Sequence, residues 1–300
     1  MNFISIFDLS RTELEAILRT AAELKTERGT RTRNDLAGKT LALLFEKPST
    51  RTRVSFEVAM LELGGNEISL NRDELQLGRG ERIRETAKVF SSYVDAVMIR
   101  AFRHSTLEEF ARYATIPVIN GLSDLEHPCQ TLADLMTIKS HKKSRKEVKV
   151  AWIGDGNNVC NSLIGGCAIT GMNISVACPG GYEPDKTIVK RAVELGCEVV
   201  IIKDIEEAAA DADVLSTDVW VSMGDEEAAE RRKNAFKRYQ INEELIRVAK
   251  EDVIVMHCMP VHVGEELTEE VLNSDYSVIF EQAENRLHAQ KALLLTLLSY

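Results

Sequence analysis

The sequence predicts an α/β protein with two doubly wound parallel-sheet domains that are joined by helical linkers. Three observations predict this fold class. The chain has 300 residues, which is too long for one typical domain and suits two. Short apolar runs of strand length alternate with amphipathic helical patterns, an order typical of βαβ units in a parallel sheet. A strongly charged run at 141–147 interrupts this alternation, and a second βαβ series follows it.

The first half of the chain begins with a helix and continues as a βαβ series. Ser10 and Glu13 have the spacing of a capping box, and an apolar stripe at helical spacing follows them. Strands are predicted at 40–46, 66–70, 95–101 and 117–120, with helices between them at 53–63, 82–93 and 106–114. These elements predict a first parallel sheet that is covered by helices.

The second half repeats the pattern after a helix expected at 127–141. Strands are predicted near 148–154, 173–178, 198–203, 213–218 and 253–259, and the chain closes with a long helix. We expect residues 1–136 and 286–300 to form one domain and residues 148–276 the other. Ligands of such sheets bind outside the carboxyl ends of the strands, so polar residues at those ends are the candidates for a site.

The composition excludes several classes of protein. A net charge of −10 and a pI of about 5.3 argue against a partner that is a nucleic acid or an anionic membrane. No apolar run approaches the roughly 18–20 residues that a membrane span needs. The six cysteines form no Cys-x-x-Cys pair, and the first residues lack the features of a signal peptide. We therefore expect a cytoplasmic protein with free thiols, without a disulfide framework or a zinc site.

One strand-to-helix turn gathers anion-binding groups, in the segment FEKPSTRTRVSFE at 45–57. The free N–H groups at a helix start attract a phosphate, and the helix dipole adds to this attraction. The side chains that can add donors are Ser49, Thr50, Arg51 and Thr52. The alternative is a capped helix with exposed arginines, but one hydroxyl would suffice for a cap. Because the whole chain is acidic, we predict a pocket for a small anion.

Two further polar groups follow strands of the first domain. Arg100 ends the run DAVMIR, where it either lines a site or reaches solvent. His127 and Gln130 lie three residues apart at the start of a predicted helix, and this spacing places them on one face. A histidine can donate to a carbonyl oxygen and a glutamine can accept from an amide, although a merely polar helix start is the alternative.

The second domain has its own polar strand ends. The turn WIGDGNNVCNSL at 152–163 looks like a dinucleotide loop, but its third glycine position is Val159 and the next strand ends without an acidic residue. We interpret it as a tight turn in which Asn157 and Asn158 can bind a small polar ligand. Asp218 ends a later strand, and Ser222 and Met223 follow it.

The last predicted strand ends with His257 and Cys258, just before Pro260 turns the chain. A buried strand cysteine is usually inert. A cysteine at the carboxyl end of a strand, beside a histidine, is more typical of a site.

Together these segments resemble the aspartate/ornithine carbamoyltransferase family, and in particular its ornithine branch. Residues 49–53 (STRTR) and 127–130 (HPCQ) are similar to the carbamoyl-phosphate motifs of the family. Residues 218–224 (DVWVSMG) and 257–260 (HCMP) are similar to the motifs of the ornithine branch, with Met259 in place of the usual leucine. The resemblance covers nearly the whole chain and includes 45–48, 76–81 and 284–286.

The resemblance implies a role for each of these residues. It places carbamoyl phosphate on the domain 1–136 with 286–300, and ornithine on the domain 148–276. The residues expected to contact carbamoyl phosphate are Ser49, Thr50, Arg51, Thr52, Gln76, Arg100, His127, Gln130, Cys258, Met259 and Arg286. Those expected to bind ornithine are Asn158, Asp218, Ser222 and Met223. Gln76 is expected on a loop near a subunit interface.

The implied reaction transfers the carbamoyl group of carbamoyl phosphate to the side-chain amine of ornithine, giving citrulline and phosphate, in arginine biosynthesis or in the reverse direction. Cys258, Arg100 and His127 are the implied catalytic residues, and either Cys258 or the phosphate takes the amine proton. No metal and no other cofactor is implied, and the family suggests a homotrimer or a multiple of trimers. Two alternatives are transfer to another amine such as putrescine, and a relative that binds ligands without catalysis.

Overall fold

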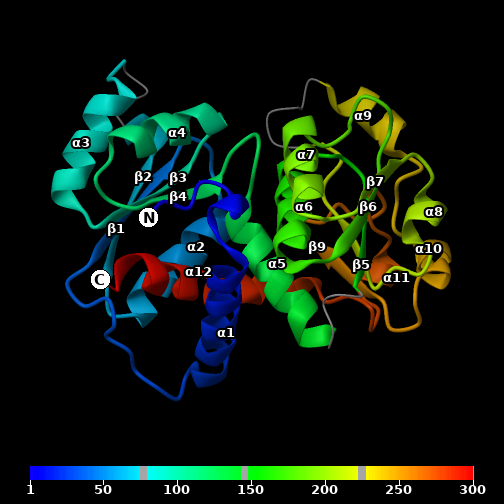
Figure 1. Cartoon of the computed structure of the whole chain (residues 1–300), viewed down its shortest axis with the longest axis horizontal. Coiled ribbons are helices and arrows are strands. Elements are labelled where there is room, and N and C mark those ends of the chain that lie inside the picture. Colours follow the sequence, from blue (N-terminus) through cyan, green and yellow to red (C-terminus); the bar gives the residue numbers. More distant parts are fainter. Residues whose placement is uncertain (75–79, 143–147, 222–227, 300) are drawn as a thin grey trace. The chain divides into compact units, whose positions relative to one another are not determined.

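The computed structural model of the chain describes residues 1–74, 80–142, 148–221 and 228–299, which form two compact units. Unit 1 consists of Met1–Ala133 together with Asn285–Tyr300, and unit 2 of Asp134–Glu284. Two long helices contain the boundaries, α5 (Pro128–His141) and α12 (Ile279–Leu298), so the chain passes from one unit to the other within a helix. The strands of each unit form a sheet of their own (Figure 1).

Unit 1 is built on four parallel strands in the order β2-β1-β3-β4. Its strands are β1 (Thr40–Phe45), β2 (Asn66–Asn71), β3 (Ala96–Arg100) and β4 (Val118–Leu122). Its other elements are η1 (Ile6–Asp8), α1 (Arg11–Glu27), α2 (Thr50–Glu62), η2 (Arg72–Glu74), α3 (Ile83–Tyr93) and α4 (His104–Tyr113), together with parts of α5 and α12. Each connection between consecutive strands contains a helix, as parallel pairing requires.

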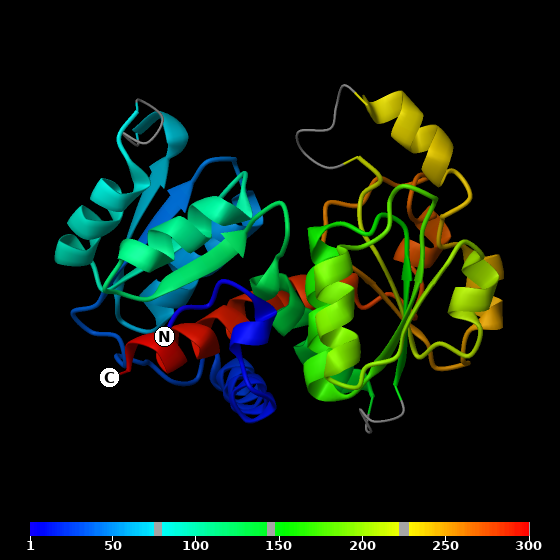
Figure 2. The same ribbon diagram turned by 45° about the horizontal axis from the view of Figure 1, so that its top comes forward.

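Helices cover both faces of this sheet, which explains why its central strands are continuously apolar. Ala42 and Leu44 of β1 point to one face, where they pack in a cluster with Leu107 and Phe110 of α4. Leu41 and Leu43 alternate with them and are equally buried on the opposite face. In Figure 1 and Figure 2, α3 and α4 lie together on one face of the sheet.

Unit 2 is built on five parallel strands in the order β7-β6-β5-β8-β9. Its strands are β5 (Lys149–Ile153), β6 (Asn173–Ala177), β7 (Val199–Ile202), β8 (Val214–Thr217) and β9 (Ile254–His257). Its helices, besides parts of α5 and α12, are α6 (Asn158–Thr170), α7 (Lys186–Glu194), α8 (Ile205–Ala209), α9 (Ala229–Phe236), α10 (Glu243–Val248) and α11 (Glu269–Leu272). Its core joins Ile153, Leu215 and Val255 of the sheet to Phe236 and Leu245 of the covering helices.

The fold class predicted from the sequence is confirmed, and each predicted strand is present within a few residues of its expected position. One helix differs in a way that matters for the site. The helix expected at 53–63 begins at Thr50, with Ser49 as its N-cap, so the residues of the predicted anion turn form the first turn of the helix itself.

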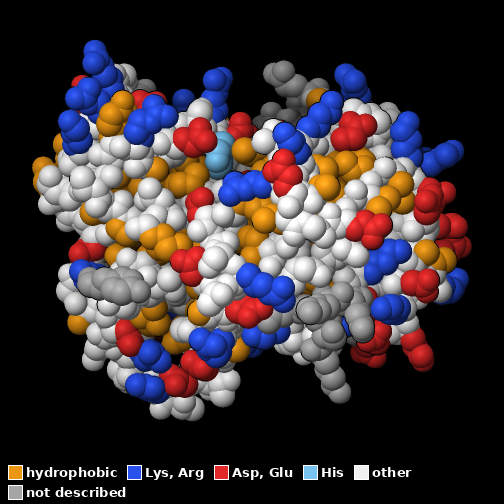
Figure 3. Space-filling view, in the orientation of Figure 1, with side chains coloured by type: hydrophobic (Ala, Val, Ile, Leu, Met, Phe, Trp, Pro, Cys, Tyr) orange, Lys and Arg blue, Asp and Glu red, His pale blue; other side chains and the backbone are white. Residues whose placement is uncertain are grey.

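Two further features of the described chain concern its helices and the charges on one face. Among the described residues, no helix combines the length and the apolar character needed to cross a membrane. On the face seen in Figure 3, lysine and arginine side chains are interspersed with aspartate and glutamate.

Candidate active site

The candidate residues of unit 1 lie at the carboxyl ends of three neighbouring strands. The turn at 46–49 follows β1, Arg100 is the last residue of β3, and His127 follows β4. Because parallel strands end at the same edge of a sheet, these three segments meet there. This is the edge at which doubly wound sheets bind ligands.

The start of α2 provides the exposed part of this cluster. The Ser49 hydroxyl accepts a hydrogen bond from the Thr52 backbone N–H at 3.4 Å, which is an N-cap. Thr50 and Arg51 are exposed in the first turn, and Arg53 is engaged in an ion pair with Glu57 at 2.7 Å. Of the two arginines in the turn, Arg51 is therefore the one that an anion can recruit without breaking an ion pair along the helix.

Arg286 of α12 ties the buried part of the cluster together. Its Nη1 donates to the Gln130 Oε1 at 2.7 Å, and its Nη2 donates to the Thr52 Oγ1 at 3.2 Å. All three side chains belong to residues that are at most 5% exposed. One guanidinium thus holds the first turn of α2 and the first turn of α5 in a fixed relation.

The ionisation of His127 reports the electrostatic field of this cluster. Burial lowers the pKa of His127 well below its usual value of 6.5, and the positive charges of Arg286, Arg100 and Lys47 lower it further. The imidazole is therefore neutral at physiological pH and can donate one hydrogen bond. Several cations that act on one buried, neutral ring make a positive cluster in an acidic chain, and such a cluster suits a small anion.

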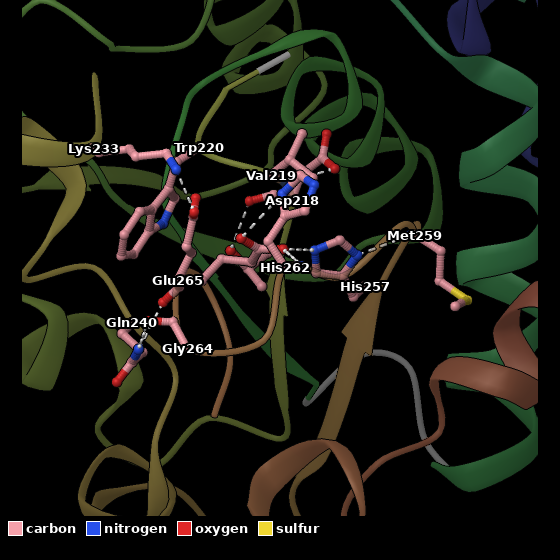
Figure 4. Close-up of polar contacts among 12 residues, drawn as sticks. Asp218, Val219, Trp220, Lys233, Gln240, His257, Met259, His262, Gly264 and Glu265 are labelled. Carbon is pink, nitrogen blue, oxygen red and sulfur yellow. Dashed lines mark hydrogen bonds and ion pairs between the residues drawn. The ribbon is translucent and has the colours of Figure 1, made fainter. Parts of the chain in front are cut away.

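In unit 2, Asp218 organises a second cluster beyond the end of β8. Its Oδ1 accepts from the Val219 N–H at 2.8 Å (Figure 4) and from the Cys258 thiol at 2.9 Å, and its Oδ2 accepts from the Asn157 Nδ2 at 2.7 Å. Asp218 is 6% exposed and Cys258 is half-buried. The carboxylate therefore connects the ends of β5, β8 and β9.

The His257 side chain forms a hydrogen bond with the backbone at this edge of the sheet. Its Nδ1 accepts from the Met259 N–H at 2.8 Å (Figure 4), and its Nε2 lies 3.1 Å from the Glu266 Oε1. Since a backbone N–H can only donate, the neutral ring carries its proton on Nε2 and donates it to Glu266. Met259 has φ of +60°, which is a strained conformation for this residue type. The Glu266–His257 pair stabilises that conformation next to Cys258.

The asparagines of the β5–α6 turn divide their roles. Asn157 is the N-cap of α6, and its Oδ1 accepts from the N–H groups of Val159 and Cys160 at 3.0 and 3.2 Å. Because its Nδ2 bonds Asp218, Asn157 is occupied by the protein itself. Asn158 begins α6 and is partly exposed.

The predicted site residues therefore fall into two clusters. Unit 1 holds those from Ser49 to Thr52 together with Arg100, His127, Gln130 and Arg286, and unit 2 holds Asn158, Asp218, Cys258 and Met259. The predictions for Gln76, Ser222 and Met223 lie outside the described residues. Sequence reasoning missed Glu266 as a partner of His257, because no sequence pattern distinguishes Glu266 from the adjacent Glu265.

Asp218, His257 and Cys258 are the residue types that bind transition metals, and their ligand atoms lie within 4.8 Å of one another. Their contacts argue for a different use. Both nitrogens of His257 already serve Met259 and Glu266, and the Cys258 thiol donates to Asp218. A metal would have to displace these hydrogen bonds.

Comparison with known proteins shows which family the chain is similar to. Residues 1–140 match the model of the aspartate/ornithine carbamoyltransferase carbamoyl-P binding domain, and residues 146–297 match that of the Asp/Orn binding domain. A protein of Archaeoglobus fulgidus named ornithine carbamoyltransferase is 55% identical over 298 residues, which are 99% of this chain and 97% of that protein. The structure of ornithine carbamoyltransferase from Pyrococcus furiosus is 49% identical with a TM-score of 0.95, covering 99% of this chain and 96% of that one. The enzyme of that name from Thermus thermophilus gives 44% identity and a TM-score of 0.91, covering 99% and 98%.

Proposed function

Because the chain belongs to the aspartate/ornithine carbamoyltransferase family, we propose that it transfers the carbamoyl group of carbamoyl phosphate to the side-chain amine of L-ornithine, giving L-citrulline and phosphate. The observation that carries this proposal within the structure is the buried, positively charged cluster around His127 in unit 1. Burial, followed by the positive charges of this cluster, suppresses the protonation of His127, and the cluster adjoins the first turn of a helix. A dianion such as carbamoyl phosphate satisfies both features.

Carbamoyl phosphate is assigned to unit 1. The N–H groups and hydroxyls of residues 49–52 and the guanidinium of Arg51 hold the phosphate, and they stabilise it as the leaving group. Arg100 and His127 donate to the carbamoyl oxygen, on which negative charge develops when the amine attacks. Gln130, whose Oε1 is oriented by Arg286, accepts from the carbamoyl NH2 group. Gln76, Cys258 and Met259 complete the proposed contacts.

Ornithine is assigned to unit 2, with Asn158, Asp218, Ser222 and Met223 as its contacts. The carboxylate of Asp218 pairs with the α-ammonium, which is the group that distinguishes an amino acid from a simple diamine. Asn158 offers its amide to the α-carboxylate. The side-chain amine, which is the nucleophile, remains free to attack the carbamoyl carbon.

The nucleophile must lose a proton before it attacks. A lysine-like amine titrates near pH 10.4, so deprotonation near pH 8 costs roughly 3 kcal/mol. Cys258 is the proposed acceptor: its Sγ, which lies 2.9 Å from the Asp218 Oδ1, takes the amine proton as a thiolate, after its own proton has passed to solvent. The phosphate oxygen is the other acceptor that the chemistry allows. The reaction then collapses to citrulline and phosphate, with no redox step.

We further propose a cytoplasmic homotrimer, or a multiple of trimers, that serves arginine biosynthesis. The exposed apolar side chains of α2 and β2 support a subunit interface on unit 1, since Leu61 is 74% exposed, Val54 51% and Ile68 49%. Light scattering would test the assembly, which should have the mass of three 33.5-kDa chains or a multiple of it.

The activity is tested by incubating the purified chain with carbamoyl phosphate and ornithine and measuring citrulline. A parallel reaction contains putrescine in place of ornithine. We expect citrulline to form and putrescine to react poorly, since it lacks both groups at the α-carbon. Equal use of putrescine would mean that another amine is the substrate. If no carbamoyl group were transferred to either amine, the protein would be a relative that binds ligands without catalysis.

A further inference from the structure

The guanidinium of Arg232 lies in the interior of unit 2, behind the proposed ornithine site. Arg232 is on α9 and is 9% exposed. Its Nη2 donates to the Asp155 Oδ2 in a close ion pair, and its Nε donates to the Trp220 carbonyl oxygen at 2.7 Å. The adjacent Arg231 on the same helix is exposed. A buried arginine with two separate partners is unusual enough to need an explanation.

Its two partners belong to the loops that carry the ornithine contacts. Asp155 follows β5 and lies two residues before Asn157, and Trp220 follows β8 and lies two residues after Asp218. The same loops are joined directly by the bond from the Asn157 Nδ2 to the Asp218 Oδ2, at 2.7 Å. Arg232 thus makes a second link between the two loops, parallel to the link at the site itself.

Packing holds this second link in place. The Arg232 guanidinium lies 5.0 Å from the ring centroid of Tyr182 and 5.5 Å from that of Phe236, within the range of cation–π contacts. The Trp220 ring stacks on Phe236 with the centroids 6.4 Å apart. The far end of the link is fixed as well, because the Trp152 indole donates to the Asp155 carbonyl oxygen at 2.8 Å. The guanidinium has little freedom to move within this cluster.

We propose that Arg232 is a positioning residue for ornithine, which fixes the loop after β8 and with it the direction of the Asp218 carboxylate. This inference rests on the proposed function of Asp218. Arg232 itself contacts neither substrate in this scheme. Its fork geometry matters because Nε and Nη2 reach a carbonyl and a carboxylate on different loops at once, which a single lysine nitrogen does not reproduce.

The test compares four variants of the full-length protein with the parent. Arg232→Met removes the link, Arg232→Lys keeps the charge without the fork, and Arg231→Met is the matched control on the same helix. Asp155→Asn/Arg232→Met removes both charges of the buried pair. The measurements are kcat and KM for ornithine, the Kd for carbamoyl phosphate, and Tm.

For Arg232→Met we expect kcat/KM for ornithine to fall by about 100-fold, mainly through KM, because a small displacement of a positioned group has effects of that size. Carbamoyl-phosphate affinity should stay within about threefold, since that ligand is assigned to the other unit. Arg231→Met should resemble the parent. The kcat/KM of Arg232→Lys for ornithine should lie between the values of the parent and of Arg232→Met. If Arg232→Met does not fold, Arg232→Lys provides the same test.

The double variant separates positioning from stability. Removing both partners of a buried ion pair restores much of the stability that is lost when one partner is left alone. We therefore expect the double variant to regain Tm over Arg232→Met while its kcat/KM for ornithine stays low. Recovery of the ornithine parameters together with Tm would overturn the proposal, and so would an Arg232→Met enzyme with a normal KM. A parent that does not use ornithine would instead overturn the proposed function.

Discussion

The ionisation of His127 provides the most direct test of the positive cluster in unit 1. Burial, followed by the charges of Arg286, Arg100 and Lys47, holds its pKa well below 6.5. In the free protein the imidazole should therefore stay neutral at pH values where exposed histidines become charged. Binding of carbamoyl phosphate, or of inorganic phosphate, should raise the pKa, because an adjacent anion favours the imidazolium.

The same shift predicts a loss of stability in acid. The unfolded chain takes up a proton at His127 below about pH 6.5, whereas the folded chain does so only at a much lower pH. The contribution of His127 to the free energy of unfolding is therefore complete above that pH and is lost as the pH falls toward the folded pKa. Between about pH 7.5 and about pH 5.5 the expected loss is on the order of 1 kcal/mol.

Two assays measure these effects. In NMR spectra of ¹³C-labelled histidine, the His127 signal is identified among the six histidines by its loss in His127→Asn. Urea unfolding of parent and His127→Asn at both pH values gives the stability term as a difference, in which the titration of all other groups cancels. Arg286→Met should raise the His127 pKa and reduce the difference. A His127 signal that titrates near 6.5 in the free protein would refute the positive cluster, and so would a His127 pKa that is the same in Arg286→Met as in the parent.

Three further substitutions test the proposed roles. Arg100→Met should fold but lose about 10²–10³ in kcat, the usual effect of removing a donor to a developing oxyanion; steady-state rates within about threefold of the parent would make Arg100 structural. Cys258→Ala should lower kcat more than carbamoyl-phosphate affinity and alter the pH–rate profile near neutrality, whereas an unchanged profile with full activity would remove the thiol from proton transfer. Asp218→Asn should lower kcat/KM for ornithine by about 10² or more while carbamoyl-phosphate binding is kept. Retained ornithine activity in that variant would contradict the assignment of Asp218.

The fold was predictable because the central strands are buried on both faces and are therefore continuously apolar. The runs at 40–46 and 95–101 became β1 and β3, which pair in the middle of the sheet of unit 1. The clustering of the candidate site residues in unit 1 was also predictable. Arg100 and the turn after β1 lie at the carboxyl ends of β3 and β1, which are paired parallel strands. The start of α2 was predicted three residues late, because Thr50, Arg51 and Thr52 are polar residues without the apolar periodicity that marks a helix.

The supporting contacts could not be predicted, because their partners are distant in the sequence or carry no distinguishing pattern. Arg232 lies 77 residues from Asp155, within a strongly charged segment that looks like a solvated helix. Its only signal is its spacing of four from Phe236, which places both on the buried face of α9. Glu266 is fully buried against His257, although a glutamate in a loop is normally exposed.

The signs of the charges in the two clusters support the assignment of the two substrates independently of the motifs. In unit 1, the buried Arg100 and Arg286 place positive charge near a neutral His127. In unit 2, the buried charge at the end of β8 is the Asp218 carboxylate, which there receives only neutral donors among the described residues. Opposite charges attract, so each cluster would favour a ligand of opposite sign. The first suits a phosphate and the second an ammonium, which are the charged groups that carbamoyl phosphate and ornithine would bring.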